Sequence, residues 1–149
     1  MVPRRRGAPR VTEMGATATS AEDAVRGADA IVTCTNSPEP IVRGAWLKPG
    51  VLVNAVGAVG PKRRELDDEA MRGAVVVDSR DAALTESGDV LLAQAPIYAE
   101  LGELLAGTKA MPKSEVTVFK SLGLAVEDLA AAKLVLQKLQ DSRLTTHAG

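Results

Sequence analysis

The stretch VLVNAVGAVGPKRREL, residues 51–66, is the part of the sequence that says most about the architecture. Its first five residues are mostly apolar, as in a buried strand, and glycines and a proline follow within a few residues. In an open parallel sheet, ligands bind beyond the carboxyl ends of the strands. The stretch therefore predicts a strand over Val51–Ala55 and, from Val56 onward, a loop that is placed to contact a ligand.

Three other apolar runs are rich in Val and Ile and have the length of a strand. The connections are long enough for crossover helices, which places the strands parallel. They include a predicted helix over residues 65–72 and two or three short helices over residues 80–107. The composition, 46% hydrophobic but only 2% aromatic, suits a parallel sheet covered by helices. We predict an α/β fold with about four strands: Ala30–Cys34, Val51–Ala55, Val75–Val77 and Val116–Phe119.

Helices are also predicted near both ends of the chain. Ser20 is a natural N-cap for a short helix that Gly27 ends. A long helix is predicted from Ser121 to about Leu139, with one apolar stripe along it. Residues 1–17 are Arg-rich and lack the apolar core of a secretory signal. We predict a disordered tail there, with an organelle transit peptide as the alternative.

Charge and composition exclude several classes of function. The chain has 149 residues, which suits one domain, and 18 Lys and Arg stand against 19 Asp and Glu. This near-neutral balance gives no footprint for nucleic acid and no attraction to an anionic membrane. No apolar stretch reaches the ~18–20 residues that span a bilayer. One His, one Cys and scattered carboxylates predict no metal site.

The single cysteine, Cys34, lies in the apolar run AIVTC and is expected to be a small buried side chain. A lone thiol cannot form an internal disulfide. We therefore expect a reducing compartment, the cytoplasm.

Four segments follow the predicted strands and carry hydroxyl, amide or small residues. Their alternative role is that of ordinary turn and cap residues, which we favour for Asp78-Ser79; for Thr35-Asn36 and Gly57-Ala58 the two roles stay open. Ser121 can either cap the long helix or hold a ligand group. No Gly-x-Gly-x-x-Gly phosphate loop occurs in the sequence. The four segments are residues 35–37, 56–59, 78–79 and 120–121.

Six stretches resemble the ornithine cyclodeaminase/mu-crystallin family, in order and over about residues 20–136. The resemblance covers the C-terminal half of such a protein. It implies an incomplete Rossmann-like domain over residues 18–149, with a last helix that returns to an N-terminal part, and a family homodimer. The stretches are GADAIVTCTNSPEPI, WLKPGVLVNAVGA, RRELDDEAM, VVVDSRDAALTESGDVLL, IYAELGELLAG and VFKSLGLAVEDLAAAKLV.

The resemblance also implies an NADPH-dependent reductase of cyclic ketimines that binds thyroid hormone. In this family, two groups of positions line the site. The cofactor group is Thr35, Asn36, Val56 and Ser121, with Ser121 at the nicotinamide end. The substrate or hormone group is Val59 and Glu86.

Val59 bears on which reaction the resemblance implies. Family cyclodeaminases and related alanine dehydrogenases carry an Asp there for proton transfer, which valine cannot perform. The reductase is therefore favoured over an ornithine cyclodeaminase-like protein. The family's substrate-binding Lys and Arg lie in the other half, so we assign no catalytic residue and expect the chain to be inactive alone. The alternatives are non-catalytic binding of NADPH or thyroid hormone, and a fragment with neither property.

Overall fold

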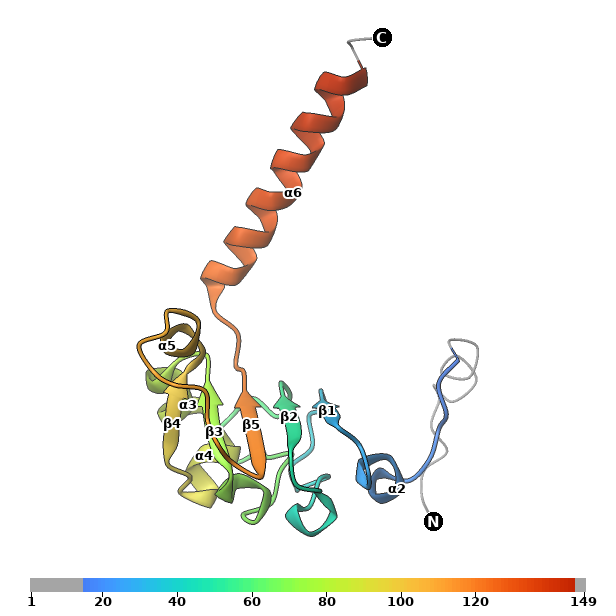
Figure 1. Cartoon of the computed structure of the whole chain (residues 1–149), viewed down its shortest axis with the longest axis vertical. Coiled ribbons are helices and arrows are strands. Elements are labelled where there is room, and N and C mark those ends of the chain that lie inside the picture. Colours follow the sequence, from blue (N-terminus) through green and yellow to red (C-terminus); the bar gives the residue numbers. More distant parts are fainter. Residues whose placement is uncertain (1–14, 147–149) are drawn as a thin grey trace.

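The computed structural model describes residues 15–146, and the predicted tail lies almost entirely outside this range. The described chain is an α/β fold built on a five-stranded, all-parallel sheet in the order β1-β2-β5-β3-β4 (Figure 1). The predicted fold class is confirmed, with one strand more than the sequence indicated. The strands are β1 Ala30–Thr33, β2 Val51–Ala55, β3 Ala74–Val77, β4 Ile97–Glu100 and β5 Val116–Lys120.

The last strand in sequence, β5, lies in the middle of the sheet between β2 and β3. Its register aligns Lys120 with Ala55 on one side and with Val77 on the other, and Ala55 is aligned with Thr33. The carboxyl ends of β1, β2, β5 and β3 therefore meet along one edge of the sheet. The segments that leave these ends are brought together there.

One face of the sheet carries the hydrophobic core. In strands β2, β5 and β3, alternate side chains such as Val53, Val118 and Val75 are fully buried and form one cluster with residues of the connecting segments. Burying one such side chain contributes about 1.5–3 kcal/mol. Leu66, Met71, Ala83 and Val90 supply the covering layer from the connections.

The other face is open over part of the sheet. Strand β1 alternates exposed and buried residues, and Val32 is 65% exposed. The prediction of a strand buried on both faces is therefore wrong for β1, which lies at the sheet edge. Cys34 is exposed as well, so the prediction of a buried thiol is wrong. The apolar run predicted the strand correctly but not how much of it is covered.

Seven helical segments complete the described chain. Helix α2 begins after Ser20, whose hydroxyl accepts from the amide of Asp23, and ends before Gly27, where φ is +80°. Helices α3 and α4 pack in the core cluster through Ala83 and Val90. The helices are α2 Ala21–Val25, α3 Arg80–Glu86, α4 Gly88–Ala93, α5 Leu101–Leu105 and α6 Ala125–Thr146, with 3-10 turns η1 Gly44–Trp46 and η2 Ala70–Arg72.

Two predicted helical regions differ from the structure. The helix predicted over residues 65–72 is only the short turn η2, because Glu65 lies at a bend bonded to residues 41–42 and Leu66 forms a bridge with Val42. The carbonyl of Glu65 accepts from the amides of Ile41 and Val42 at 2.8 and 3.0 Å. Strand β4 lies within a stretch that was predicted as helices only. Residues 97–100 follow Pro96 and pair with β3.

The long helix α6 begins at Ala125 rather than at Ser121, because residues 121–124 are not helical and Gly123 has a φ of +84°. Figure 1 shows α6 projecting away from the sheet, beyond the carboxyl ends of the strands. All side chains of residues 125–140 are exposed, including Val126 and Leu129. None of the described helices is long and apolar enough to cross a membrane.

Candidate functional site

The loops after β1, β2 and β5 continue the sheet ladder beyond the strands. The amide of Val56 donates to the carbonyl of Thr33 at 2.9 Å, and the amide of Ala58 donates to the carbonyl of Thr35 at 2.6 Å. The amide of Ser121 donates to the carbonyl of Ala55 at 3.1 Å. These bonds bring three of the predicted site residues, Thr35, Val56 and Ser121, to one edge.

The other three predicted site residues flank this group. The carbonyl of Asn36 accepts from the Arg63 guanidinium at 2.9 Å. The carbonyl of Glu86 accepts from the amide of Gly60 at 2.8 Å, which fixes the loop that carries Val59 beside the end of α3. The side chains of Asn36, Val59 and Glu86 are exposed. Val56 and Val59, at 41% and 51% exposure, give the loop an apolar outer surface.

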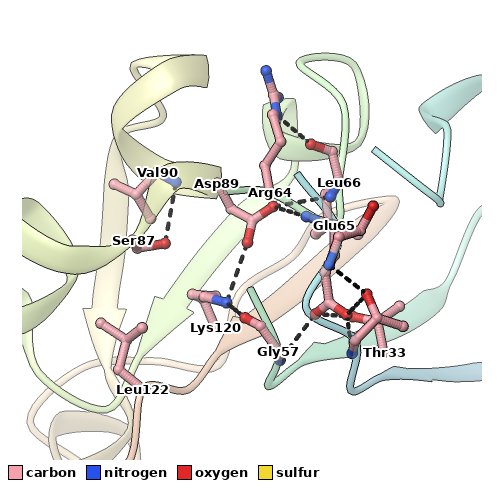
Figure 2. Close-up of polar contacts among 12 residues, drawn as sticks. Thr33, Gly57, Arg64, Glu65, Leu66, Ser87, Asp89, Val90, Lys120 and Leu122 are labelled. Carbon is pink, nitrogen blue, oxygen red and sulfur yellow. Dashed lines mark hydrogen bonds and ion pairs between the residues drawn. The ribbon is translucent and has the colours of Figure 1, made fainter. Parts of the chain in front are cut away.

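Glu65, which was not singled out from the sequence, joins these loops through hydrogen bonds to its side chain. Its carboxylate is fully buried and accepts four hydrogen bonds (Figure 2). Oε1 accepts from the amide and hydroxyl of Thr35 at 2.6 and 2.8 Å. Oε2 accepts from the hydroxyl of Thr33 at 2.7 Å and the amide of Gly57 at 2.9 Å. Glu65 therefore joins the ends of β1 and β2.

Asp89 and Lys120 extend this buried network toward β5. Asp89 Oδ1 accepts from the amides of Glu65 and Leu66 at 2.8 and 2.9 Å. Its Oδ2 lies 3.2 Å from Lys120 Nζ, which also donates to the carbonyl of Gly57. Lys120 and Asp89 both have 0% exposure. Buried charges of this kind require partners, and Figure 2 shows how the network supplies them.

Gly57 is the point at which the loops approach most closely. A Cβ atom at this position would lie 2.2 Å from the carbonyl oxygen and 2.4 Å from the amide nitrogen of Thr35. Its amide is held by Glu65 and its carbonyl by Lys120. Ala58 follows with φ of 51°, in the left-handed region that residues with a side chain rarely adopt. The chain is therefore tightly constrained where it leaves β2.

Asp78, at the end of β3, shapes the segment that follows β5. Its Oδ2 accepts from the hydroxyl of Ser121 at 3.1 Å and from the amides of Leu122 and Gly123, both at 2.7 Å. Ser121 therefore does not cap α6, which corrects one of its two predicted roles. Ser79 does cap helix α3, the ordinary role favoured from the sequence.

Farther along the same edge, Glu103 ties helix α5 to the ends of β3 and β4. Its Oε2 accepts from the amide of Glu100 at 2.7 Å and pairs with the Arg80 guanidinium at 2.5 Å. The Glu100 amide, and next to it Arg80, lower the pKa of the Glu103 carboxyl. Glu100 in turn accepts from the amide of Arg80 at 2.7 Å.

Within residues 15–146, no group of three or more His, Cys, Asp or Glu side chains is placed to hold a metal ion. Glu65 and Asp89 escaped prediction because charged residues in a sequence are usually solvated. Lys120 lies in the predicted segment 120–121, but its burial was not predicted. One signal was available, since Lys120 directly ends an apolar strand that the structure buries.

Comparison with known proteins assigns this chain to a family. The family model for "Ornithine cyclodeaminase/mu-crystallin family" matches residues 8–143. The chain belongs to the ornithine cyclodeaminase/mu-crystallin family. The resemblance drawn from the sequence is thereby confirmed.

The curated relatives of this chain include proteins named as two different reductases. The chain is 62% identical over 117 residues to ketimine reductase mu-crystallin of Mus musculus, covering 78% of this chain and 37% of the relative. It is 44% identical over 135 residues to a Delta(1)-pyrroline-2-carboxylate reductase of Bacillus thuringiensis, covering 83% and 41%. The chain thus spans about two fifths of the length of these relatives.

Solved structures of similar proteins share the fold. Delta(1)-pyrroline-2-carboxylate reductase of Thermococcus litoralis, in complex with NADH and L-proline, has a TM-score of 0.77 and 36% identity, over 89% of this chain and 45% of that one. An archaeal alanine dehydrogenase dimer with bound NAD has a TM-score of 0.76 and 31% identity, over 91% and 46%. Both neighbours were solved with a nicotinamide dinucleotide bound.

Proposed function

We propose that this chain forms one wall of the nicotinamide-nucleotide site of an NAD(P)H-dependent reductase that acts on cyclic ketimines. The observation that carries the proposal is the convergence of Thr35, Val56 and Ser121 at the carboxyl edge of β1, β2 and β5. The relatives named as ketimine and pyrroline-2-carboxylate reductases support the reaction class. NADPH is the proposed cofactor.

The residues present fit part of such a cofactor. The exposed side chains of Val56 and Val59 offer apolar surface for a flat ring, and the exposed Asn36 amide offers donors and an acceptor. The bound nicotinamide would supply the hydride. This chain's residues would orient the ring and exclude water from one side of it. The sequence contains no Gly-x-Gly-x-x-Gly loop, so the grip on the pyrophosphate would come from elsewhere.

Val59 and Glu86 are the proposed contacts for the substrate or for thyroid hormone. Their loops are joined by the bond from the Gly60 amide to the Glu86 carbonyl. Valine cannot transfer a proton, which supports a reductase rather than a cyclodeaminase. Assembly as a homodimer and location in the cytoplasm belong to the same proposal.

A second candidate is binding of NADPH or thyroid hormone without turnover by this chain. One observation favours it: of the six proposed site residues, only Glu86 carries an ionisable side chain. The two candidates differ in catalysis, so measurable turnover of a cyclic ketimine would exclude the second, whereas its absence is compatible with both. We expect the chain alone to give no measurable turnover of Delta(1)-pyrroline-2-carboxylate with NADPH, and turnover would refute the second candidate.

Binding is tested by titrating the chain with NADPH and NADH and following cofactor fluorescence. We expect saturable binding that Val56→Lys weakens by about tenfold or more, because a charged, longer side chain replaces exposed apolar surface at the proposed site. Val126→Lys, at an exposed valine of α6, is the matched control and should bind like the parent. Absence of saturation, or equal curves for both variants, would contradict the proposal.

A further inference from the structure

We propose that Glu65 is a positioning residue, whose buried carboxylate sets the loop that carries Val56 and Val59 in the conformation that accepts the nucleotide. The statement that this loop conformation accepts the nucleotide rests on the proposed function. The statement that Glu65 fixes the conformation of the loop rests on the structure alone. Glu65 itself has 0% exposure, so it acts through the loop rather than by contact with a ligand.

The hydrogen bonds of Glu65 are arranged so that both of its oxygens are needed. Oε1 accepts the amide of Thr35 and Oε2 accepts the amide of Gly57, at 2.6 and 2.9 Å. A main-chain N–H group can only donate a hydrogen bond, so each of these two groups requires an acceptor opposite it. A carboxylate provides two acceptor oxygens at this spacing, whereas a side-chain amide provides one acceptor oxygen and an NH₂ group that only donates.

Gly57 is the target on which the network converges. Its amide is bonded to Glu65 and its carbonyl to Lys120, while Thr35 leaves no room for a side chain there. The residues on either side of it, Val56 and Ala58, are bonded to the end of β1 through the ladder. A shift of Gly57 would therefore displace the exposed valines of the same loop.

The backbone of Glu65 is fixed independently of its carboxylate. Its amide donates to Asp89 and its carbonyl accepts from Ile41 and Val42. The carboxylate can therefore be altered while the segment that carries it stays in place. This separation makes a positioning role testable.

The test variant is Glu65→Gln, which keeps the size of the side chain but sets an NH₂ donor against one of the two amides. We expect amide hydrogen exchange at Thr35 or Gly57 to accelerate by about tenfold or more, since a hydrogen bond to a charged acceptor is lost. Amides within β2 and β5 should keep their protection. The dissociation constant for NADPH should rise by a similar factor.

Glu69→Gln is the matched control, because Glu69 lies in the same connection but is exposed. It should change neither exchange nor binding. If Glu65→Gln leaves exchange at Thr35 and Gly57 unchanged, or accelerates exchange equally throughout the sheet, Glu65 is not a positioning residue and the inference is overturned. If the parent chain binds no nucleotide, the proposed function fails, and local exchange alone decides the inference.

A milder variant covers the case in which Glu65→Gln does not fold. Thr33→Val removes one of the four donors to the carboxylate and retains a buried side chain of the same shape. We expect exchange at Gly57 to accelerate severalfold, with protection in β5 retained. Unchanged exchange at Gly57 in this variant would also count against the proposal.

Discussion

Lys120 and Asp89 form an ion pair that is completely withdrawn from water. Removing two charges from water costs several kcal/mol per ion, and the cost is offset only when both have further partners. Here Asp89 also accepts two main-chain amides, and Lys120 also donates to the carbonyl of Gly57. The pair is therefore most vulnerable to the loss of one member.

We predict that Lys120→Met lowers the free energy of unfolding by about 3–5 kcal/mol, because Asp89 is left as an unpaired buried charge. Adding Asp89→Asn should recover part of this loss, which a double-mutant cycle from urea unfolding measures. Lys113→Met, at an exposed lysine, is the control and should stay within about 0.5 kcal/mol of the parent. Equal effects at the two lysines would show that the buried pair has no special role.

For single residues, the sequence indicates which ones are candidates for the site, but not how deeply they are buried or which partners they contact. Thr35, Val56 and Ser121 were predictable, because the ends of parallel strands converge whatever the details of the loops. Glu65 was not, since its partners lie in distant parts of the sequence. Cys34 was misjudged for a related reason: its burial depends on whether a neighbouring element covers β1, which a local apolar run does not report.

Among the helices and strands, α5 is short, and its stability depends on the hydrogen bonds of its first turn. Glu100 and Glu103 form a capping box, and Glu103 also pairs with Arg80 at the start of α3. The Glu100 amide and Arg80 lower the pKa of Glu103 from its ordinary value of 4.5. A carboxyl with a lowered pKa stabilises the fold above that ordinary value, and this contribution is lost as the pH falls through the folded pKa.

We therefore predict that Glu103→Gln destabilises the chain at pH 7 and that the difference from the parent shrinks as the pH falls below 4.5. Urea unfolding of both proteins across this pH range measures the difference. Glu115→Gln, at an exposed glutamate, corrects for the general effect of removing one carboxylate. A difference that stays constant or grows toward acid pH would refute the role assigned to Glu103.

Elements were predictable to the extent that local pattern defines them. The strands β2, β3 and β5 follow from apolar runs, whereas the sheet position of β4 depends on its pairing with β3. The helix predicted over residues 65–72 has helix-forming composition, yet the backbone of Glu65 and Leu66 is bonded to residues 41–42 and to Asp89 instead. Tertiary hydrogen bonds outweighed local propensity there.

Across the whole molecule, apolar side chains are divided between a closed core and open surfaces. Leu66 has 0% exposure within the core cluster, whereas Leu129 on α6 is 70% exposed. Exposed apolar surface on this scale, on α6 and on the open face of β1 and β2, is typical of regions that contact another protein surface. The hydrophobic core cluster of the described chain therefore lies on one face of the sheet.

A matched pair of substitutions tests this division. Leu66→Ala should lower the free energy of unfolding by about 2–5 kcal/mol, since it leaves a cavity in the core. Leu129→Ala should change it by less than about 0.5 kcal/mol in the same chain. Chemical denaturation measures both, and a large loss for Leu129→Ala would mean that α6 packs against another surface in solution.

The central position of β5 bears on how the protein is made. During synthesis, β1–β2 and β3–β4 leave the ribosome as two separate strand pairs, and nothing in the sheet joins them until residues 116–120 emerge. Long-range pairing of this kind is slow and leaves strand edges unprotected meanwhile. Lys120, the last residue of that strand, then completes the buried charge network. A nascent chain halted before this point would therefore lack both the middle of its sheet and the cation that pairs with the buried carboxylate of Asp89.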